Sequence, residues 1–420
     1  MRLAAVCAAV VCACASSTPP KELPLRQPLV RTAFPLGGRP GASVPVEVAG
    51  EFLDRAVAIR CDCEDLRGSV TKAAFSRVEA ALEIAGDAEP GPRVLYVDSP
   101  RGTSNRFLFR VTRWESAIER KPNDQPDSAQ VISSPVVVEG RVARLTDTDF
   151  YRFRARAGER LAFNVMTSRS KALGFVSITL LDSGGAELAH NNARFGPDPY
   201  FEYRFERAGE YRVVLTARRF ADFFTVLKDD QLLNMHYQLA IGRSPILWSL
   251  WPMGGRRGTQ VDAELRADFI PDGAQPRITG SGVHLELAPL PDDCRCRHRI
   301  SIRIDPDAAT GVRYLSLLDD SGNTMYLGFA VGEEPEVAEA SDKPQRVDLP
   351  VTINGRVTAA EKDSFRIKVN QDDEVTVDLQ ARGLGSGMID PQIALVRAEG
   401  DLVALSDDRC RACPGRWRRL

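Results

Sequence analysis

Apolar and polar residues alternate over short stretches along most of this chain. Residues 43–48, 200–205 and 260–265 each alternate with a period of two, and turns rich in Gly and Asn separate several such stretches. Successive side chains of a β-strand face opposite sides of the sheet, so this period predicts half-buried strands. The sequence predicts an all-β protein, in which residues 72–82 are the one fair candidate for a helix.

A long internal repeat divides the chain. Residues 34–41 read Phe-Pro-Leu-Gly-Gly-Arg-Pro-Gly and return at 251–258 as Trp-Pro-Met-Gly-Gly-Arg-Arg-Gly. Residues 149–153 return at 363–367 in the same way. Each copy lies about 215 residues after its original, which indicates a tandem of one unit.

Each unit has two strand-rich parts. The first parts, residues 34–112 and 246–332, end in a hairpin and have the length of an immunoglobulin-like β-sandwich. The second parts, residues 119–243 and 341–408, predict a sandwich of another kind. The sequence therefore predicts four β-sandwich domains in tandem.

The last copy of the second part is shorter than the first. The first copy uses residues 191–242 for its last strands, whereas only residues 409–420 follow position 408. We predict a truncated chain whose last sandwich lacks its closing strands and has open edges. Residues 409–420 are basic and irregular, and a zinc or redox tail built on Cys410 and Cys413 is the alternative.

Residues 1–15 have the features of an export signal. Arg2 supplies a positive charge, residues 3–15 are small or apolar, and Ala13-Cys14-Ala15 fits the cleavage rule. The run is too short to span a bilayer, and no other stretch is longer, so we predict a chain that is not transmembrane. We expect a secreted, periplasmic or cell-surface protein; a membrane anchor or lipidation at Cys14 are the alternatives.

Charge and motifs exclude several function classes. The net charge is -2, which gives no electrostatic basis for binding nucleic acid. The chain has four His residues and contains no His-Glu-x-x-His, no Gly-x-Ser-x-Gly and no phosphate-binding loop. We therefore predict no enzymatic activity.

Six cysteines follow the export signal, and an even number in an exported chain permits disulfides. Residues two apart on a strand rarely bond each other without strain, so the pairing stays open. The segment 293–298, with two Cys and one His, is an alternative zinc site that lacks a visible fourth ligand. The six are Cys61, Cys63, Cys294, Cys296, Cys410 and Cys413.

An aromatic and basic segment, residues 218–224, interrupts the last strands of the first complete unit. It is the best surface candidate for a partner, which we expect to be an extracellular protein or polysaccharide. Its candidate contact residues are Arg219, Phe220, Phe223 and Phe224.

Residues 119–241 resemble the bacterial pre-peptidase C-terminal domain, a β-sandwich found beside secreted proteases. The second copy resembles it from residue 347 to 408 without the linker triplet. The fold expected from this resemblance is jelly-roll-like. The matching segments are residues 122–124 (Pro-Asn-Asp), 138–142, 148–153, 157–161 (Ala-Gly-Glu-Arg-Leu), 180–185 and 208–211.

The resemblance implies an ancillary role without catalysis. It also implies a possible calcium site, because the related collagen-binding domains of clostridial collagenases bind calcium through acidic residues near the linker; oxygen ligands suit this ion. Lys121 stands where the family often has Glu, and the alternative is that these residues cap a turn and start a strand. Carried over by position, the ligands are Glu119, Asn123, Asp124, Asp147 and Asp149.

Together these features predict an exported, non-catalytic binding or accessory protein that serves adhesion, substrate docking or secretion. The alternative is a truncated, non-catalytic portion of a larger secreted peptidase or other hydrolase.

Overall fold

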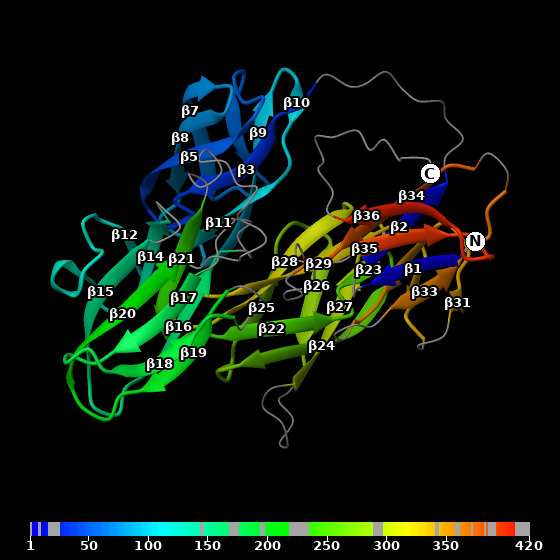
Figure 1. Cartoon of the computed structure of the whole chain (residues 1–420). Coiled ribbons are helices and arrows are strands. Elements are labelled where there is room, and N and C mark those ends of the chain that lie inside the picture. The colour runs from blue at the N-terminus through cyan, green and yellow to red at the C-terminus, as the bar shows by residue number, and fades with distance from the viewer. Residues whose placement is uncertain are drawn as a thin grey trace.

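The chain folds as an all-β tandem of β-sandwiches in the computed structural model, as the sequence predicts (Figure 1). No α-helix occurs among the described residues. The structure therefore shows, in the part of the chain that it describes, no helix long and apolar enough to cross a bilayer. The structure describes residues 2–6, 10–15, 26–142, 147–167, 176–193, 198–217, 235–288, 297–340, 344–357, 362–370, 373–381, 384 and 392–407.

The first sandwich is one continuous nine-stranded sheet that closes around a single apolar core. Its strand order is β3-β5-β8-β7-β6-β9-β11-β4, with β10 paired to β9. The strands are β3 (Leu29–Phe34), β4 (Gly37–Gly38), β5 (Ser43–Glu51), β6 (Ala58–Cys61), β7 (Leu66–Ala74), β8 (Arg77–Ile84), β9 (Gly91–Ser99), β10 (Gly102–Thr103) and β11 (Phe107–Val111).

The helix predicted over residues 72–82 is wrong. These residues form the turn and flanking parts of the β7–β8 hairpin. Val78, Ala80, Leu82 and Ile84 are buried and alternate with exposed or half-buried residues, which is the period of a strand. The Ala-rich composition suggested a helix, but the alternation of burial decides the local structure.

The second sandwich has two five-stranded sheets, β12-β14-β21-β16-β19 and β13-β15-β20-β17-β18, and a short 3-10 turn, Pro126–Ser128. Aromatic side chains such as Tyr151, Phe153 and Tyr237 fill its core. The strands are β12 (Glu115–Ile118), β13 (Gln130–Val131), β14 (Val136–Arg141), β15 (Thr148–Ala155), β16 (Arg160–Met166), β17 (Val176–Leu181), β18 (Glu187–Asn191), β19 (Tyr200–Arg204), β20 (Gly209–Ala217) and β21 (His236–Gly242).

The third sandwich repeats the strand order of the first but splits it into two sheets, β22-β24-β27-β26 and β23-β29-β28-β25. In the first sandwich one pair, Ile59 with Gly68, joins β6 to β7 and makes the sheet continuous. The strands are β22 (Ile246–Trp251), β23 (Gly254–Arg256), β24 (Gln260–Asp268), β25 (Gln275–Ile278), β26 (Val283–Leu287), β27 (Arg297–Ile304), β28 (Gly311–Leu318) and β29 (Tyr326–Gly332).

The fourth sandwich combines both ends of the described chain. In Figure 1 the blue strands β1 and β2 lie among the orange and red strands of the last domain. Its sheets are β31-β33-β1-β35-β36 and β30-β32-β2-β34. The strands are β1 (Arg2–Val6), β2 (Val10–Ala15), β30 (Glu336–Ala338), β31 (Gln345–Arg346), β32 (Val351–Asn354), β33 (Asp363–Arg366), β34 (Val375–Gln380), β35 (Gln392–Val396) and β36 (Leu402–Asp407).

This arrangement differs from the open edges expected of the last sandwich. The positions of the expected missing strands are filled by β1 and β2, within the segment that the sequence marks as an export signal. Strand pairing satisfies backbone groups that an apolar groove would otherwise leave without partners. Cleavage after residue 15 stays a prediction.

The two sandwiches of each unit meet through the same kind of contact. The guanidinium of Arg141 in the second sandwich lies 4.1 Å from the centre of the Phe34 ring in the first. The repeat equivalents, Arg356 and Trp251, have the same contact at 4.4 Å between the fourth and third sandwiches. The repeat therefore preserves the way its two parts meet.

Candidate functional site

Three of the predicted ligand residues meet at the start of the second sandwich. Glu119 follows β12, Asp147 precedes β15, and Asp149 lies in β15. The backbone fixes Glu119 twice: its N–H donates to the Glu139 carbonyl at 2.8 Å, and its Oε2 accepts the Arg141 N–H at 2.8 Å. We call Glu119, Lys121, Asp147 and Asp149 the linker cluster.

The ammonium of Lys121 lies at the centre of this cluster. Its Nζ is 2.9 Å from Glu119 Oε1, 3.1 Å from Asp147 Oδ1 and 2.5 Å from Asp149 Oδ1. The three carboxylate side chains are only 3–6% exposed, whereas that of Lys121 is 39% exposed. One cation thus bridges three nearly buried anions, which repel one another without it.

Tyrosines of the core extend the cluster inward. The Tyr237 hydroxyl donates to Asp149 Oδ2 at 2.7 Å, and the hydroxyls of Tyr151 and Tyr237 are 2.5 Å apart. Burial, reinforced by the charge of Glu119, raises the pKa of Asp149 to about 7, although bonds from Lys121 and Tyr237 oppose this. Burial acts to lower the pKa of Lys121, but bonds and charge from Asp149 and Glu119 outweigh it and raise that pKa.

This arrangement does not fit a calcium ion. The space among the three carboxylates that an ion would need is taken by the Lys121 ammonium. The other two predicted ligands are placed differently. Asn123 is fully buried, and its carbonyl accepts the Phe150 N–H at 2.7 Å; Asp124 is half-buried. Across the part of the chain that the structure describes, no group of three His, Cys, Asp or Glu side chains is arranged to hold a metal.

The fourth sandwich keeps part of the linker cluster. Glu339 repeats Glu119, because its N–H donates to Asn354 at 2.8 Å and its Oε2 accepts the Arg356 N–H at 2.9 Å. Asp363 repeats Asp149 and is buried. The equivalents of Lys121 and Asp147, at positions 341 and 361, lie outside the described residues.

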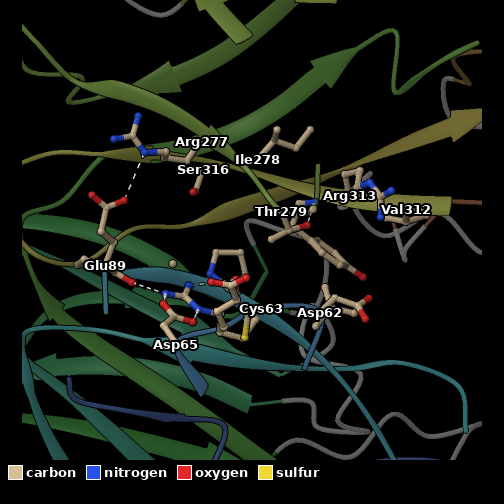
Figure 2. Close-up of a pocket in the computed structure, with 18 of the residues that line it drawn as sticks. Asp62, Cys63, Asp65, Glu89, Arg277, Ile278, Thr279, Val312, Arg313 and Ser316 are labelled. Atoms are coloured by element: carbon tan, nitrogen blue, oxygen red, sulfur yellow. Dashed lines mark hydrogen bonds and ion pairs between the residues drawn. The ribbon is translucent and has the colours of Figure 1, made fainter. Parts of the chain in front are cut away.

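A groove between the first and third sandwiches is the second concentration of polar side chains (Figure 2). Residues 62–65 and 87–94 line one wall, residues 277–280 and 312–316 line the other, and its volume is about 400 Å³. Both signs of charge face it. Arg93 binds both carboxylate oxygens of Asp65, at 2.9 and 2.5 Å, while Arg277 and Glu89 meet across the gap at 3.4 Å.

An apolar cluster that reaches the lining of the groove joins its two walls. Val94 and Leu108 of the first sandwich pack with Met253, Val312 and Tyr314 of the third. Burial of apolar side chains from both sandwiches stabilises the interface. Sequence reasoning missed this site because its walls lie far apart in the chain.

A disulfide joins Cys61 to Cys63, which lines the groove, and their Cα atoms are 5.0 Å apart. The sequence left the pairing of these cysteines open. Residue 61 ends β6 and residue 63 lies in the bend that follows, so the two are not consecutive positions of one extended strand. Cys294, Cys296, Cys410 and Cys413 lie outside the described residues, as do Arg219, Phe220, Phe223 and Phe224.

Glu139 is a buried carboxylate that the sequence did not indicate. Its Oε2 accepts the Leu36 N–H at 3.1 Å, and its Oε1 accepts from Gln238 Nε2 at 2.6 Å, so it joins the first and second sandwiches. Complete burial raises its pKa to about 7. Gly37 allows this close approach, since an added Cβ would lie 2.8 Å from the Arg110 carbonyl oxygen and 2.9 Å from Gln238 Nε2.

Comparisons with known proteins give structural likenesses only. No protein-family model and no curated protein matches the chain. Among solved structures, the chain is similar to the pre-peptidase C-terminal domain of a collagenase from Bacillus anthracis, at 15% identity and a TM-score of 0.21, over 28% of this chain and 99% of that one.

Two further likenesses cover more of the chain. FdeC, an Escherichia coli adhesin, is 11% identical over 73% of this chain and 96% of its own, with a TM-score of 0.18. The Bacteroides ovatus glucan-utilization protein SGBP-B, solved with a heptasaccharide, is 11% identical over 50% of this chain and 73% of its own, also at 0.18. Identities and scores of this size assign no family.

Proposed function

We propose that this chain is an exported, non-catalytic binding or accessory protein, and that the groove between its first and third sandwiches receives an extended polar ligand. The observation that carries the proposal is the groove itself, whose two walls come from separate sandwiches held by a shared apolar cluster. A cleft between rigid domains is pre-organised, so a ligand that fills it orders little protein.

The lining favours a protein ligand over a neutral polysaccharide. Glu89 and Arg277, with side chains 55% and 48% exposed, offer a carboxylate and a guanidinium from opposite walls. A polypeptide carries charges of both signs that can replace this weak, solvent-exposed pair, whereas a neutral glycan has none. Thr279 and Ser316, also in the lining, add hydroxyls.

We also propose the domain assignment made from the sequence: immunoglobulin-like sandwiches at residues 34–112 and 246–332, and pre-peptidase-like sandwiches at 119–243 and 341–408. Its support is the match of motifs and the shared strand order of the repeat. Export through residues 1–15 is part of the same proposal.

Binding of the whole chain to immobilised collagen, other matrix proteins and common polysaccharides tests the function. Glu89→Arg and Arg277→Glu each put like charges across the groove, and we expect each to weaken binding at least 10-fold. Arg303→Glu is the matched control, because Arg303 pairs with Asp305 within the third sandwich and does not line the groove. Equal binding by all four proteins would reject the groove, and hydrolysis of a generic protein substrate would reject the non-catalytic role.

A further inference from the structure

The fourth sandwich receives its two central strands from the other end of the chain. In the second sandwich β20 lies between β15 and β17, and β21 lies between β14 and β16. In the fourth, β1 lies between β33 and β35, and β2 lies between β32 and β34. All eight pairings are antiparallel. Strands β1 and β2 thus take the places and directions of β20 and β21.

The register agrees as well as the order. In β1, Leu3 pairs with Phe365 on one side and Leu395 on the other. In β20, Val213 pairs with Tyr151 and Leu180, the repeat equivalents of those two residues. A slip of one residue would exchange the two faces of a strand, so agreement in register is a specific match.

The second inserted strand shows the same agreement. In β2, Val11 pairs with Ile353 and Leu379. In β21, Leu239 pairs with Val138 and Val165 at the equivalent positions. Both inserted strands therefore place an apolar residue in the register of a core residue of the second sandwich.

The places that β20 and β21 occupy in the second sandwich supply much of its core. In the second sandwich β20 and β21 supply six of the buried core residues: Tyr211, Val213, Leu215, Tyr237, Leu239 and Ile241. Without β1 and β2, each sheet of the fourth sandwich would be divided, and four strand edges would present backbone groups without partners. The fourth sandwich therefore contains two slots, one in each sheet, that each require a strand.

We propose that the fourth sandwich is a strand-binding site with two slots, and that its ligand is the pair of strands at residues 2–6 and 10–15 of this chain. Backbone pairing on both sides of each strand gives the affinity, and Leu3 and Val11 take the register positions of Val213 and Leu239. The same residues are the predicted export signal. Removal of residues 1–15 would open both slots, so retention of this segment and completion of the fourth sandwich are one event.

Amide hydrogen exchange tests the proposal on the whole chain, produced without export so that residues 1–15 are retained. We expect amides of β32–β35 to be protected in the whole chain and to lose at least 100-fold of protection in a variant that starts at Ser16. Adding a synthetic peptide of residues 1–15 should restore the protection. Unchanged protection in the shortened variant, or a loss that the peptide does not restore, would overturn the proposal.

Matched substitutions in the whole chain test the register. Leu3→Ser with Val11→Ser changes the two core-register positions, and Ala4→Ser with Cys12→Ser changes their neighbours one position along. We expect the first pair to lower the protection of β32–β35 at least 10-fold more than the second. The amides of β14–β17 serve as the internal reference. Equal effects of the two pairs of substitutions would show that binding does not depend on the register, and would contradict the proposal.

Discussion

The second and fourth sandwiches share one strand order but differ in the origin of their closing strands. In the second, β20 and β21 follow the strands that they complete, and their side chains, including Tyr237, enter the core and the linker cluster. In the fourth, β1 and β2 come from more than 300 residues away and have five and six residues, whereas β20 and β21 have nine and seven. The entropic cost of bringing chain segments together rises with their separation.

Strand order and stability are therefore set separately in these two sandwiches. Sheet order follows from the repeated pattern of apolar residues, which both copies keep. Stability depends on how much each closing strand buries and on the polar contacts that it completes. We therefore expect the second sandwich to be the more stable of the two, and equivalent changes in the two to have unequal effects.

The largest contrast is expected at a glycine of the repeat. A Cβ added at Gly140 would lie 2.1 Å from the Tyr237 ring, which is fully buried and held by hydrogen bonds. Gly140→Ala should therefore destabilise the second sandwich by about 3 kcal/mol. Among the described residues, the atom nearest to a Cβ added at Gly355 is Glu339 Oε2 at 3.2 Å, which is the end of a side chain and not a buried ring. Gly355→Ala should cost less than about 1 kcal/mol in the fourth sandwich.

Urea unfolding followed by hydrogen exchange in each sandwich measures both changes. Equal losses of stability in the two variants would show that the closing strand of the fourth sandwich packs as closely as β21 does.

A second contrast concerns Lys121. Lys121→Met leaves three nearly buried carboxylates without their cation. We expect the free energy of unfolding to fall by about 2 kcal/mol. This is less than for a fully buried ion pair, because Lys121 is partly exposed. Millimolar calcium should raise the Tm of this variant, since it can replace the lost charge, and should leave the unsubstituted chain unchanged.

The control for that substitution is Lys72→Met, whose exposed ion pair with Glu79 spans 3.7 Å and should be worth less than about 0.5 kcal/mol. A calcium-dependent Tm in the unsubstituted chain would show that Lys121 does not exclude the ion.

A third contrast depends on pH. Burial, aided by the nearby Arg141 charge, lowers the pKa of His236 to about 3 in the folded chain. Between pH 6.5 and 3 the unfolded state binds the proton and the folded state does not, so stability falls as the pH falls through this window. At pH 5 the loss is about 2 kcal/mol relative to neutral pH.

His236→Asn removes this loss, so its stability relative to the unsubstituted chain should improve by about 2 kcal/mol from pH 7 to pH 5. The comparison of the two proteins at each pH isolates His236 from Glu139 and Asp149, whose raised pKa values act in the opposite direction. A constant difference across the range would show that His236 titrates normally.

The smallest effects are expected at the shared junction. Arg141→Ala and Arg356→Ala each remove a guanidinium from an aromatic ring, at 4.1 and 4.4 Å, and each should cost about 0.5–1 kcal/mol. Equal costs, measured by thermal unfolding, would show that the junction is preserved where the closing strands are not. A cost confined to one junction would show that the contacts differ in strength.

Much of the fold could be predicted from the sequence, because alternation and the repeat both report local constraints. Residues 43–48 and 260–265 alternate, and β5 and β24 begin at Ser43 and Gln260. The hairpin at residues 66–84 was missed because Ala and Lys favour helices locally, while burial of Val78 and Leu82 on one face is a tertiary effect.

The polar sites were less predictable. The sequence positions of Glu119, Asp147 and Asp149 predicted correctly that these residues are neighbours. The sequence did not predict that the Lys121 ammonium lies among them, because that depends on the conformation of a long side chain. The groove and Glu139 depend on packing between sandwiches, which no local pattern reports. The insertion of β1 and β2 was hidden because a short apolar run has the same composition in an export signal and in a core strand.

The position of β1 beside β35 has a mechanical consequence. Strands β1, β35 and β36 are neighbours in one sheet, so both ends of the described chain enter the same sandwich (Figure 1). A tension applied between those ends would act by shear on the fourth sandwich alone, and the other three would carry none until β1 and β2 had been pulled out. The two ends of the described chain are thus held together by one sandwich, and they separate only when β1 and β2 leave it.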